Sequence, residues 1–140
     1  MASGVAAIIK NVAPAVQVVG CSPAASAVMY HSLRAGRVLD LPSEPTLSDG
    51  TAGGIEPDTI TFDVLATMLD DFVTVEEDDI RGAFLDLIEV EGLLVEGSAA
   101  MAYAAARAYS KRSAGTTAVV LCGGNVGVER LHAILDDAVG

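Results

Sequence analysis

Short runs of nearly continuous apolar residues alternate along the chain with longer stretches whose apolar residues recur at helical spacing. The runs at 16–20, 72–75 and 118–121 predict buried strands, because a strand covered by helices on both faces carries apolar side chains on both. Strands that alternate with helices are typical of a parallel sheet with crossover helices, so the predicted fold class is α/β. The helical spacing is found in three sets: Val5, Ile8, Ile9 and Val12; Ile60, Val64, Leu65 and Met68; and Ile80, Phe84, Leu87 and Ile88.

Two further helices and one long loop complete the predicted elements. The stretch 96–110 is rich in alanine, a strong helix former, and 126–139 has the spacing of a last amphipathic helix. The segment 39–58 fits neither period, holds three prolines and three glycines, and is predicted to be a loop. Loops of this length are uncommon in compact domains and are often functional. The residues that the last helix directs inward are Leu131, Ile134 and Leu135.

The composition is that of one domain, which we place at residues 1–140. Hydrophobic residues make up 51% of the chain and aromatic residues 4%, so the core must consist mainly of Val, Leu, Ile and Ala. The first predicted helix has no strand before it, which leaves the sheet short of strands on one side. We therefore expect a single α/β domain that is truncated before its N-terminal part.

Charge and cysteine usage limit the classes of partner and compartment. The net charge is −11 and the eight basic residues are scattered, so a nucleic-acid backbone would be repelled. No apolar stretch reaches the ~18 residues of a membrane span, and the first residues lack the basic region of a signal peptide. Cys21 and Cys122 each follow an apolar run, which indicates two buried free thiols. We expect a cytoplasmic protein with no nucleic-acid or membrane partner.

The sharpest local motif is Cys122-Gly123-Gly124-Asn125, between the predicted strand 118–121 and the last helix. Two glycines at this point permit a tight turn and close approach of the backbone to a ligand. The carboxyl ends of parallel strands are also where open α/β sheets bind ligands. The same residues suit a plain strand-to-helix turn with a buried thiol. The glycine spacing is not that of the G-x-G-x-x-G dinucleotide fingerprint.

Together with this turn, motifs along nearly the whole chain resemble those of one family, in order and at similar spacing. They resemble fold-type II pyridoxal-phosphate (PLP) dependent enzymes, the threonine and serine dehydratases and serine racemases. The resemblance implies the C-terminal part of the large domain of an enzyme related to tryptophan synthase β. The segments that carry it are S-L-R-A-G-R at 32–37, T-L-S-D-G at 46–50, L-D-D-F-V-T-V at 69–75, L-V-E-G-S-A-A at 94–100 and C-G-G-N at 122–125.

The resemblance implies PLP as the cofactor and assigns six residues to its binding. Cys122 matches a Ser or Cys that lies against the pyridine nitrogen of the cofactor. An uncharged partner leaves that nitrogen largely unprotonated, which suits β-elimination. The glycine backbone of the T-L-S-D-G loop lies beside the cofactor in the family, and the glutamate of the fourth motif stands at the edge of its pocket. The six residues are Gly50, Glu96, Cys122, Gly123, Gly124 and Asn125.

This sequence departs from the family pattern at a divalent-metal site and at the start of the alanine-rich helix. The E-P turn of the family is Ser22-Pro23 here, and Val28 stands where serine racemases carry a metal-binding aspartate. We therefore expect no metal site. Gly97 and Ala99 replace the Pro and Gly that are usual in the family.

The Schiff-base lysine in an S-x-K motif and the glycine-rich phosphate loop of the family have no counterpart in this sequence. The residues at 2–6 resemble those that follow the phosphate loop. Lys10 and Lys111 are expected at solvated helix ends, whereas a Schiff-base lysine needs a desolvated amine. No catalytic residue is therefore assigned.

These observations predict a C-terminal fragment of a PLP-dependent L-threonine or L-serine dehydratase, which forms a 2-oxo acid and ammonia, and which is inactive alone. Two alternatives stay open. One is a truncated or pseudoenzyme subunit without catalysis that associates with another chain, because half a sheet leaves apolar surface exposed. The other is a serine racemase or hydroxyaspartate dehydratase. Expected partners are an amino-acid substrate and either a second copy or the missing N-terminal part.

Overall fold

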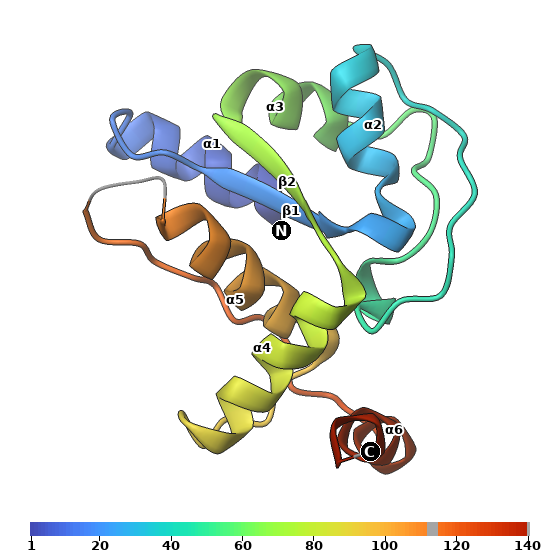
Figure 1. Ribbon diagram of the computed structural model, residues 1–140. Helices are drawn as coiled ribbons and strands as arrows, with labels where there is room; N and C mark the ends of the chain where they lie inside the picture. Colours follow the sequence, from blue (N-terminus) through green and yellow to red (C-terminus); the bar gives the residue numbers. More distant parts are fainter. Residues whose placement is uncertain (112–114, 140) are drawn as a thin grey trace.

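The computed structural model describes residues 1–111 and 115–139, with side chains described as far as Leu135. The chain forms helices packed around a small sheet (Figure 1). Its elements are α1 (Ala2–Val12), β1 (Val19–Pro23), η1 (Ala24–Ser26), α2 (Val28–Ala35), η2 (Asp49–Thr51), α3 (Thr61–Met68), β2 (Asp71–Val75), α4 (Glu77–Glu89), α5 (Gly97–Ser110) and α6 (Val128–Val139).

In the part of the chain that the structure describes, the sheet consists of two parallel strands. β1 pairs with β2 in a register that runs from Val19 opposite Asp71 to Pro23 opposite Val75. Figure 1 shows the strands between α5 on one side and α2 and α3 on the other. This arrangement confirms the predicted α/β class with a parallel sheet and flanking helices.

One predicted strand is confirmed in place and one is shifted. The run 72–75 lies within β2, whereas β1 begins three residues later than the run 16–20 and extends to Pro23. Val16 is 49% exposed, and its amide donates to the Ala13 carbonyl in a turn that follows α1. The ladder with β2 decides where β1 begins and ends, and a partner strand cannot be read from the local apolar run.

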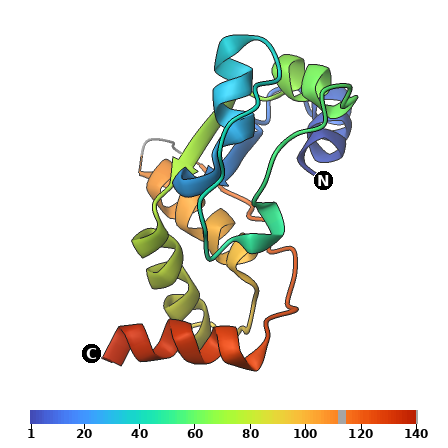
Figure 2. The ribbon, with the colours of Figure 1, turned by 90° about the vertical axis from the view of Figure 1, so that its right-hand side faces the viewer.

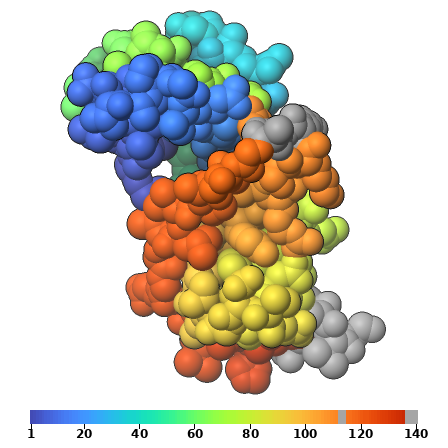
Figure 3. All heavy atoms as spheres, turned by 90° about the vertical axis from the view of Figure 1, so that its left-hand side faces the viewer, coloured from blue at the N-terminus to red at the C-terminus, as the bar shows by residue number. Residues whose placement is uncertain are grey.

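The prediction of a strand at 118–121 is wrong. These residues carry no regular secondary structure, and Val120 is 52% exposed. A strand needs a neighbour to accept and donate its backbone hydrogen bonds, and no described strand lies beside this segment. In the space-filling view an opening separates α1 from the segment that follows residue 115 (Figure 3).

The helix predictions hold, with one error at the C-terminus. α1, α3, α4 and α5 coincide with the predicted helical stretches, and 39–58 is a loop apart from the short turn η2. In α6, Ile134 is 1% exposed and Leu131 is partly buried, as predicted. Leu135 is 37% exposed, so the prediction that it points inward is wrong. Figure 2 shows α6 lying across the end of α4 at the edge of the molecule. A helix in this position buries only the side chains on one face.

The core lies between α4, α5 and the end of β2. Ile80, Phe84 and Leu87 of α4 are fully buried against the alanine-rich face of α5. Because those alanines have short side chains, the two helices pack closely over their whole contact. The remaining members of this cluster include Val75, Val95, Met101 and Ile134.

An ion pair joins α1 to the start of β2. The ammonium of Lys10 lies 2.6 Å from a carboxylate oxygen of Asp70 and donates to the Val16 carbonyl at 2.9 Å. The same carboxylate accepts the amide of Val18 at 2.6 Å. These hydrogen bonds and the charge of Lys10 lower the pKa of Asp70. The aspartate therefore fixes the corner between α3 and β2.

Candidate functional site

Glu96 lies at the N-terminus of α5, where three chain segments meet. It precedes the helix in an extended conformation and is half-buried. Its carboxylate accepts the hydroxyl of Ser98 at 2.6 Å, and the helix N-terminus favours a negative charge there. The glutamate side chain is therefore held at the start of α5.

The turn at 122–123 is bound to this helix start. The Glu96 amide donates to the Gly123 carbonyl at 3.1 Å, and Ser98 Oγ lies 3.4 Å from the Cys122 carbonyl oxygen. Gly123 has φ +106°, a conformation that residues with a side chain rarely adopt. A Cβ at this position would also overlap the Glu96 carboxyl group. Glycine is thus required at 123 both by its backbone and by the close approach of Glu96.

Gly50, in the turn η2, forms the third side of the site. A Cβ built on Gly50 would lie 3.7 Å from Glu96 Oε1, so the bare backbone of Gly50 faces the carboxylate. Asn125 and Glu96 both line a small pocket of about 50 Å³ beside this loop. The structure therefore brings Gly50, Glu96 and Gly123 together from positions far apart in the sequence, with Asn125 at their edge. Their role in cofactor binding stays a prediction.

The loop at residues 46–51, called the Gly50 loop below, is itself held by the first turns of α4 and α5. The Leu47 amide donates to Glu77 Oε2 at 2.7 Å. At Gly97, a Cβ would overlap the Leu47 carbonyl group, so only glycine admits the loop at this distance. The replacement at 97, noted above as a departure from the family pattern, therefore has a direct steric reason in this chain.

The two cysteines differ in environment, and the prediction that both are buried is wrong for one of them. Cys122 is exposed at the turn, whereas Cys21 in β1 is partly covered. Burial raises the pKa of the Cys21 thiol to about 11. Cys122 is thus the thiol that a ligand or reagent can reach.

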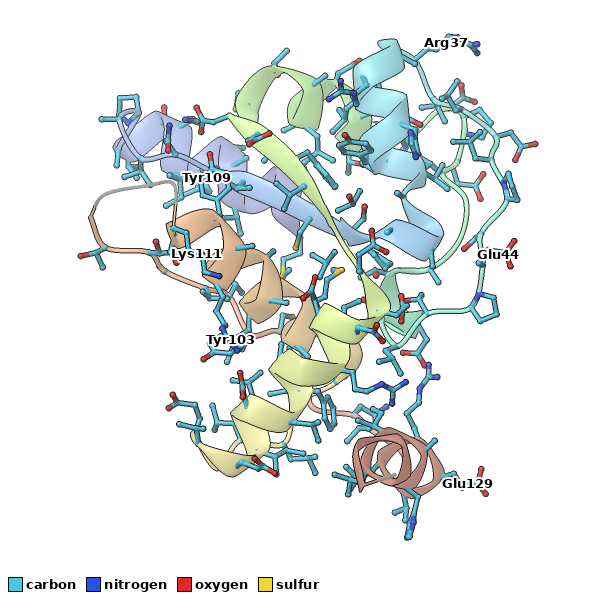
Figure 4. All side chains as sticks on the ribbon, viewed as in Figure 1. Arg37, Glu44, Tyr103, Tyr109, Lys111 and Glu129 are labelled. Atoms are coloured by element: carbon cyan, nitrogen blue, oxygen red, sulfur yellow. The ribbon has the colours of Figure 1, made fainter. Side chains whose placement is uncertain are left out.

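Neither lysine lies at this site. Lys10 lies at the end of α1 in a partly exposed ion pair with Asp70. Lys111 follows the last turn of α5, at the opposite end of that helix from Glu96 (Figure 4). Within the described residues, no group of three or more His, Cys, Asp or Glu side chains converges as metal ligands would. Among these residues there is also no helix with the length and apolarity needed to cross a membrane.

Sequence reasoning missed three residues that build the site: Ser98, Glu77 and Arg130. Ser98 binds Glu96 and Glu77 binds the loop, while Arg130 at the start of α6 forms an ion pair with Asp49 at 2.8 Å. For one of them, Arg130, the sequence did carry a signal. A basic residue in the first turn of a helix opposes the helix dipole, so Arg130 needs a specific acidic partner to be favourable there.

Bare backbone lies beside Glu96. Gly50 and Gly123 approach its carboxyl group, and Gly124 follows in the turn that begins at the exposed Cys122. A thiol is a weak hydrogen-bond donor and acceptor. Ser98 holds the Glu96 side chain at this place.

Comparison with known proteins identifies the family of this chain. A family model described as "Pyridoxal-phosphate dependent enzyme" matches residues 1–123. The chain is 35% identical over 136 residues to an L-threonine ammonia-lyase of Geobacter sulfurreducens. This match covers 96% of the present chain but only 33% of that protein. It is 34% identical over 131 residues to a biosynthetic L-threonine dehydratase of Halalkalibacterium halodurans, of which it covers 31%. The chain thus spans about a third of the length of these relatives.

Solved structures agree with the sequence relatives. The processed form of threonine deaminase isoform 2 from Solanum lycopersicum superposes with a TM-score of 0.87 at 29% identity, over 96% of this chain and 40% of that one. Maize serine racemase gives a TM-score of 0.83 at 27% identity, over 97% and 43% of the two chains. The chain therefore belongs to the fold-type II pyridoxal-phosphate dependent enzymes, in the family of the threonine and serine dehydratases.

Proposed function

We propose that this chain forms one wall of the PLP site of a dehydratase that acts on L-threonine or L-serine. The observation that carries the proposal is the meeting of Gly50, Glu96 and Gly123 beside the exposed Cys122, in a chain whose family binds PLP. When bound, PLP supplies the electron sink that allows an amino acid to lose its α-proton and its β-hydroxyl group.

The chain's own residues position and enclose that group. Cys122 would hold the pyridine ring through its thiol, and the turn through Gly123 and Asn125 would offer backbone to it. Ser98 and the helix N-terminus fix the position of the Glu96 side chain, which would stand at the edge of the group. Gly50 adds a second stretch of bare backbone beside Glu96. None of these residues is assigned the proton transfer from substrate.

We further propose that catalysis needs a complementary region that carries the Schiff-base lysine and the phosphate loop, supplied either by a further part of the same protein or by another chain. The apolar residues Ile8 and Val12 of α1, and Val120 of the segment that follows residue 115, are 65%, 69% and 52% exposed. Large apolar side chains left exposed to this extent support a surface that other protein covers. Two free thiols, Cys21 and Cys122, suit a reducing compartment, so we propose the cytoplasm.

The experiment that tests the proposal combines PLP binding with complementation. The chain is mixed with PLP, and protection of Cys122 from a thiol reagent is measured at pH 8, where the Cys21 thiol with its raised pKa reacts slowly. The chain alone should release no 2-oxo acid from L-threonine or L-serine. Addition of the region of the Geobacter sulfurreducens enzyme that precedes the matched part should restore release. Turnover by the chain alone, or no protection of Cys122 by PLP, would contradict the proposal.

A non-catalytic subunit is the second candidate, favoured by the exposed apolar residues named above. It predicts association with a partner but no protection of Cys122 and no restored turnover. A racemase or hydroxyaspartate dehydratase would be identified in the same complementation assay by D-serine from L-serine or by turnover of hydroxyaspartate.

A further inference from the structure

Arg130 of α6 contacts the Gly50 loop at two residues, Thr46 and Asp49. Its guanidinium Nη2 lies 2.8 Å from Asp49 Oδ2 and donates to the Thr46 carbonyl at 3.3 Å. Thr46 and Ser48 are buried, so this segment passes through the protein while Asp49 and Gly50 reach the surface. One side chain from a distant helix therefore fixes the loop where it enters and where it turns.

The second oxygen of Asp49 continues this contact to the site. Asp49 Oδ1 accepts the Gly50 amide at 3.0 Å while Oδ2 is bound to Arg130. Gly50 in turn faces Glu96 Oε1. Direct contacts thus run from Arg130 through Asp49 to the Gly50 amide, and the Cβ side of Gly50 is turned toward the carboxylate of Glu96.

The exposure of the ion pair separates local order from overall stability. The side chains of Arg130 and Asp49 are 38% and 68% exposed. Pairs of this exposure contribute little to the free energy of unfolding, because water screens them. The consequence of the contact is therefore expected in the position of the loop and much less in the stability of the fold.

We infer that Arg130 is a positioning residue, which acts through Asp49 to hold the Gly50 backbone against Glu96, so that the docking of α6 sets the shape of the cofactor-facing wall. The inference rests on the proposed function for its link to the cofactor. The positional part depends only on the contacts of this chain.

Hydrogen–deuterium exchange of the chain without ligand tests the positional part. Arg130→Ala should accelerate exchange of the amides at 46–51 by about three- to tenfold and leave those of β2 unchanged. Arg130→Lys keeps the charge and should recover part of the protection. Asp49→Asn keeps an oxygen for the Gly50 amide but loses the ion pair, so it should give an intermediate rate.

A matched control is available in α5. Arg107 forms an ion pair with Asp86 of α4, also half-exposed and remote from the Gly50 loop. Arg107→Ala should leave exchange at 46–51 as in the wild type. The inference is overturned if Arg130→Ala leaves these amides unchanged, or if it accelerates exchange equally in β2, which would indicate general destabilisation.

The same variants are then titrated with pyridoxal 5′-phosphate, and protection of Cys122 from the thiol reagent is measured. Arg130→Ala should need about three- to tenfold more PLP for half protection, by the same loss of loop order. Failure of PLP to protect wild-type Cys122 would count against the proposed function and not against the positioning role, which the exchange data decide.

Discussion

The α4–α5 side of the molecule and the α1 side differ in how completely they are packed. On the α4–α5 side, Ile80, Phe84 and Leu87 are 0%, 1% and 1% exposed and form one continuous cluster. On the α1 side, Ala6 is the buried residue of the helix, and Ile8 and Val12 face outward. The first side is packed by its own core, whereas the second leaves apolar side chains exposed.

The site lies on the packed side of this division. Glu96, Gly97 and Ser98 begin α5, and the loop that carries Gly50 is held by α4, α5 and α6. A rigid support of this kind keeps the position of a binding wall fixed before any ligand arrives. The proposed cofactor-facing surface thus belongs to the part of the molecule that is packed by its own core, and the proposed partner surface belongs to the other part.

The largest expected effect is on the packed side. Phe84→Ala removes the largest fully buried side chain and should lower the free energy of unfolding by about 3–5 kcal/mol, measured by chemical denaturation. Val90, which is 75% exposed at the end of α4, gives the control: Val90→Ala should change it by less than about 0.5 kcal/mol. A loss below about 1 kcal/mol for Phe84→Ala would contradict a continuous core.

The next effect separates two glycines by their surroundings. Gly97→Ala should lower the free energy of unfolding by about 1–3 kcal/mol and displace the Gly50 loop, because its Cβ overlaps the Leu47 carbonyl group. Gly82 in α4 has nothing within 4 Å of its Cβ position, so Gly82→Ala should instead raise stability by about 0.5–1 kcal/mol. Equal signs for the two variants would refute the steric account of Gly97.

A smaller effect with a pH signature is expected where the two sides meet. The pKa of Asp70 is lowered by Lys10 and the Val18 amide, so its contribution to stability is present above the ordinary carboxyl value of 3.8 and is lost as the pH falls through the lowered pKa. Asp70→Asn should therefore be less stable than the wild type at neutral pH. The free energies of unfolding of the two proteins, measured by chemical denaturation as a function of pH, should converge below pH 3.8. A constant difference down to the lowest pH would disprove the ion pair as the cause.

The smallest effect on stability is predicted on the open side, with a clear effect on association. The double change Ile8→Ser and Val12→Ser removes two outward apolar side chains and should alter the free energy of unfolding by less than about 0.5 kcal/mol. Binding to the complementary region, followed by analytical ultracentrifugation, should weaken at least tenfold if these residues are buried in that interface. Val90→Ser is the matched control, and an equal loss with it would contradict the assignment of the open side.

The sequence alone determined the helices, the class of fold and the family. The helical periods over 5–12, 60–68 and 80–88 and the five family motifs are each defined by residues close together in the sequence. They can therefore be recognised without knowing which distant residues are in contact. The sequence also placed Gly50, Glu96 and Gly123 in one site through the resemblance, before their contacts were known.

Only the tertiary structure decided what depends on a neighbour far along the chain. The run 118–121 has the composition of a strand but no described strand beside it, and β1 takes its bounds from β2. Cys122 is exposed although it follows an apolar run, because the turn is held outward by Glu96 and Ser98. The contact of Arg130 with Asp49 spans residues too distant for any local pattern to encode, since pairing is a property of three-dimensional packing.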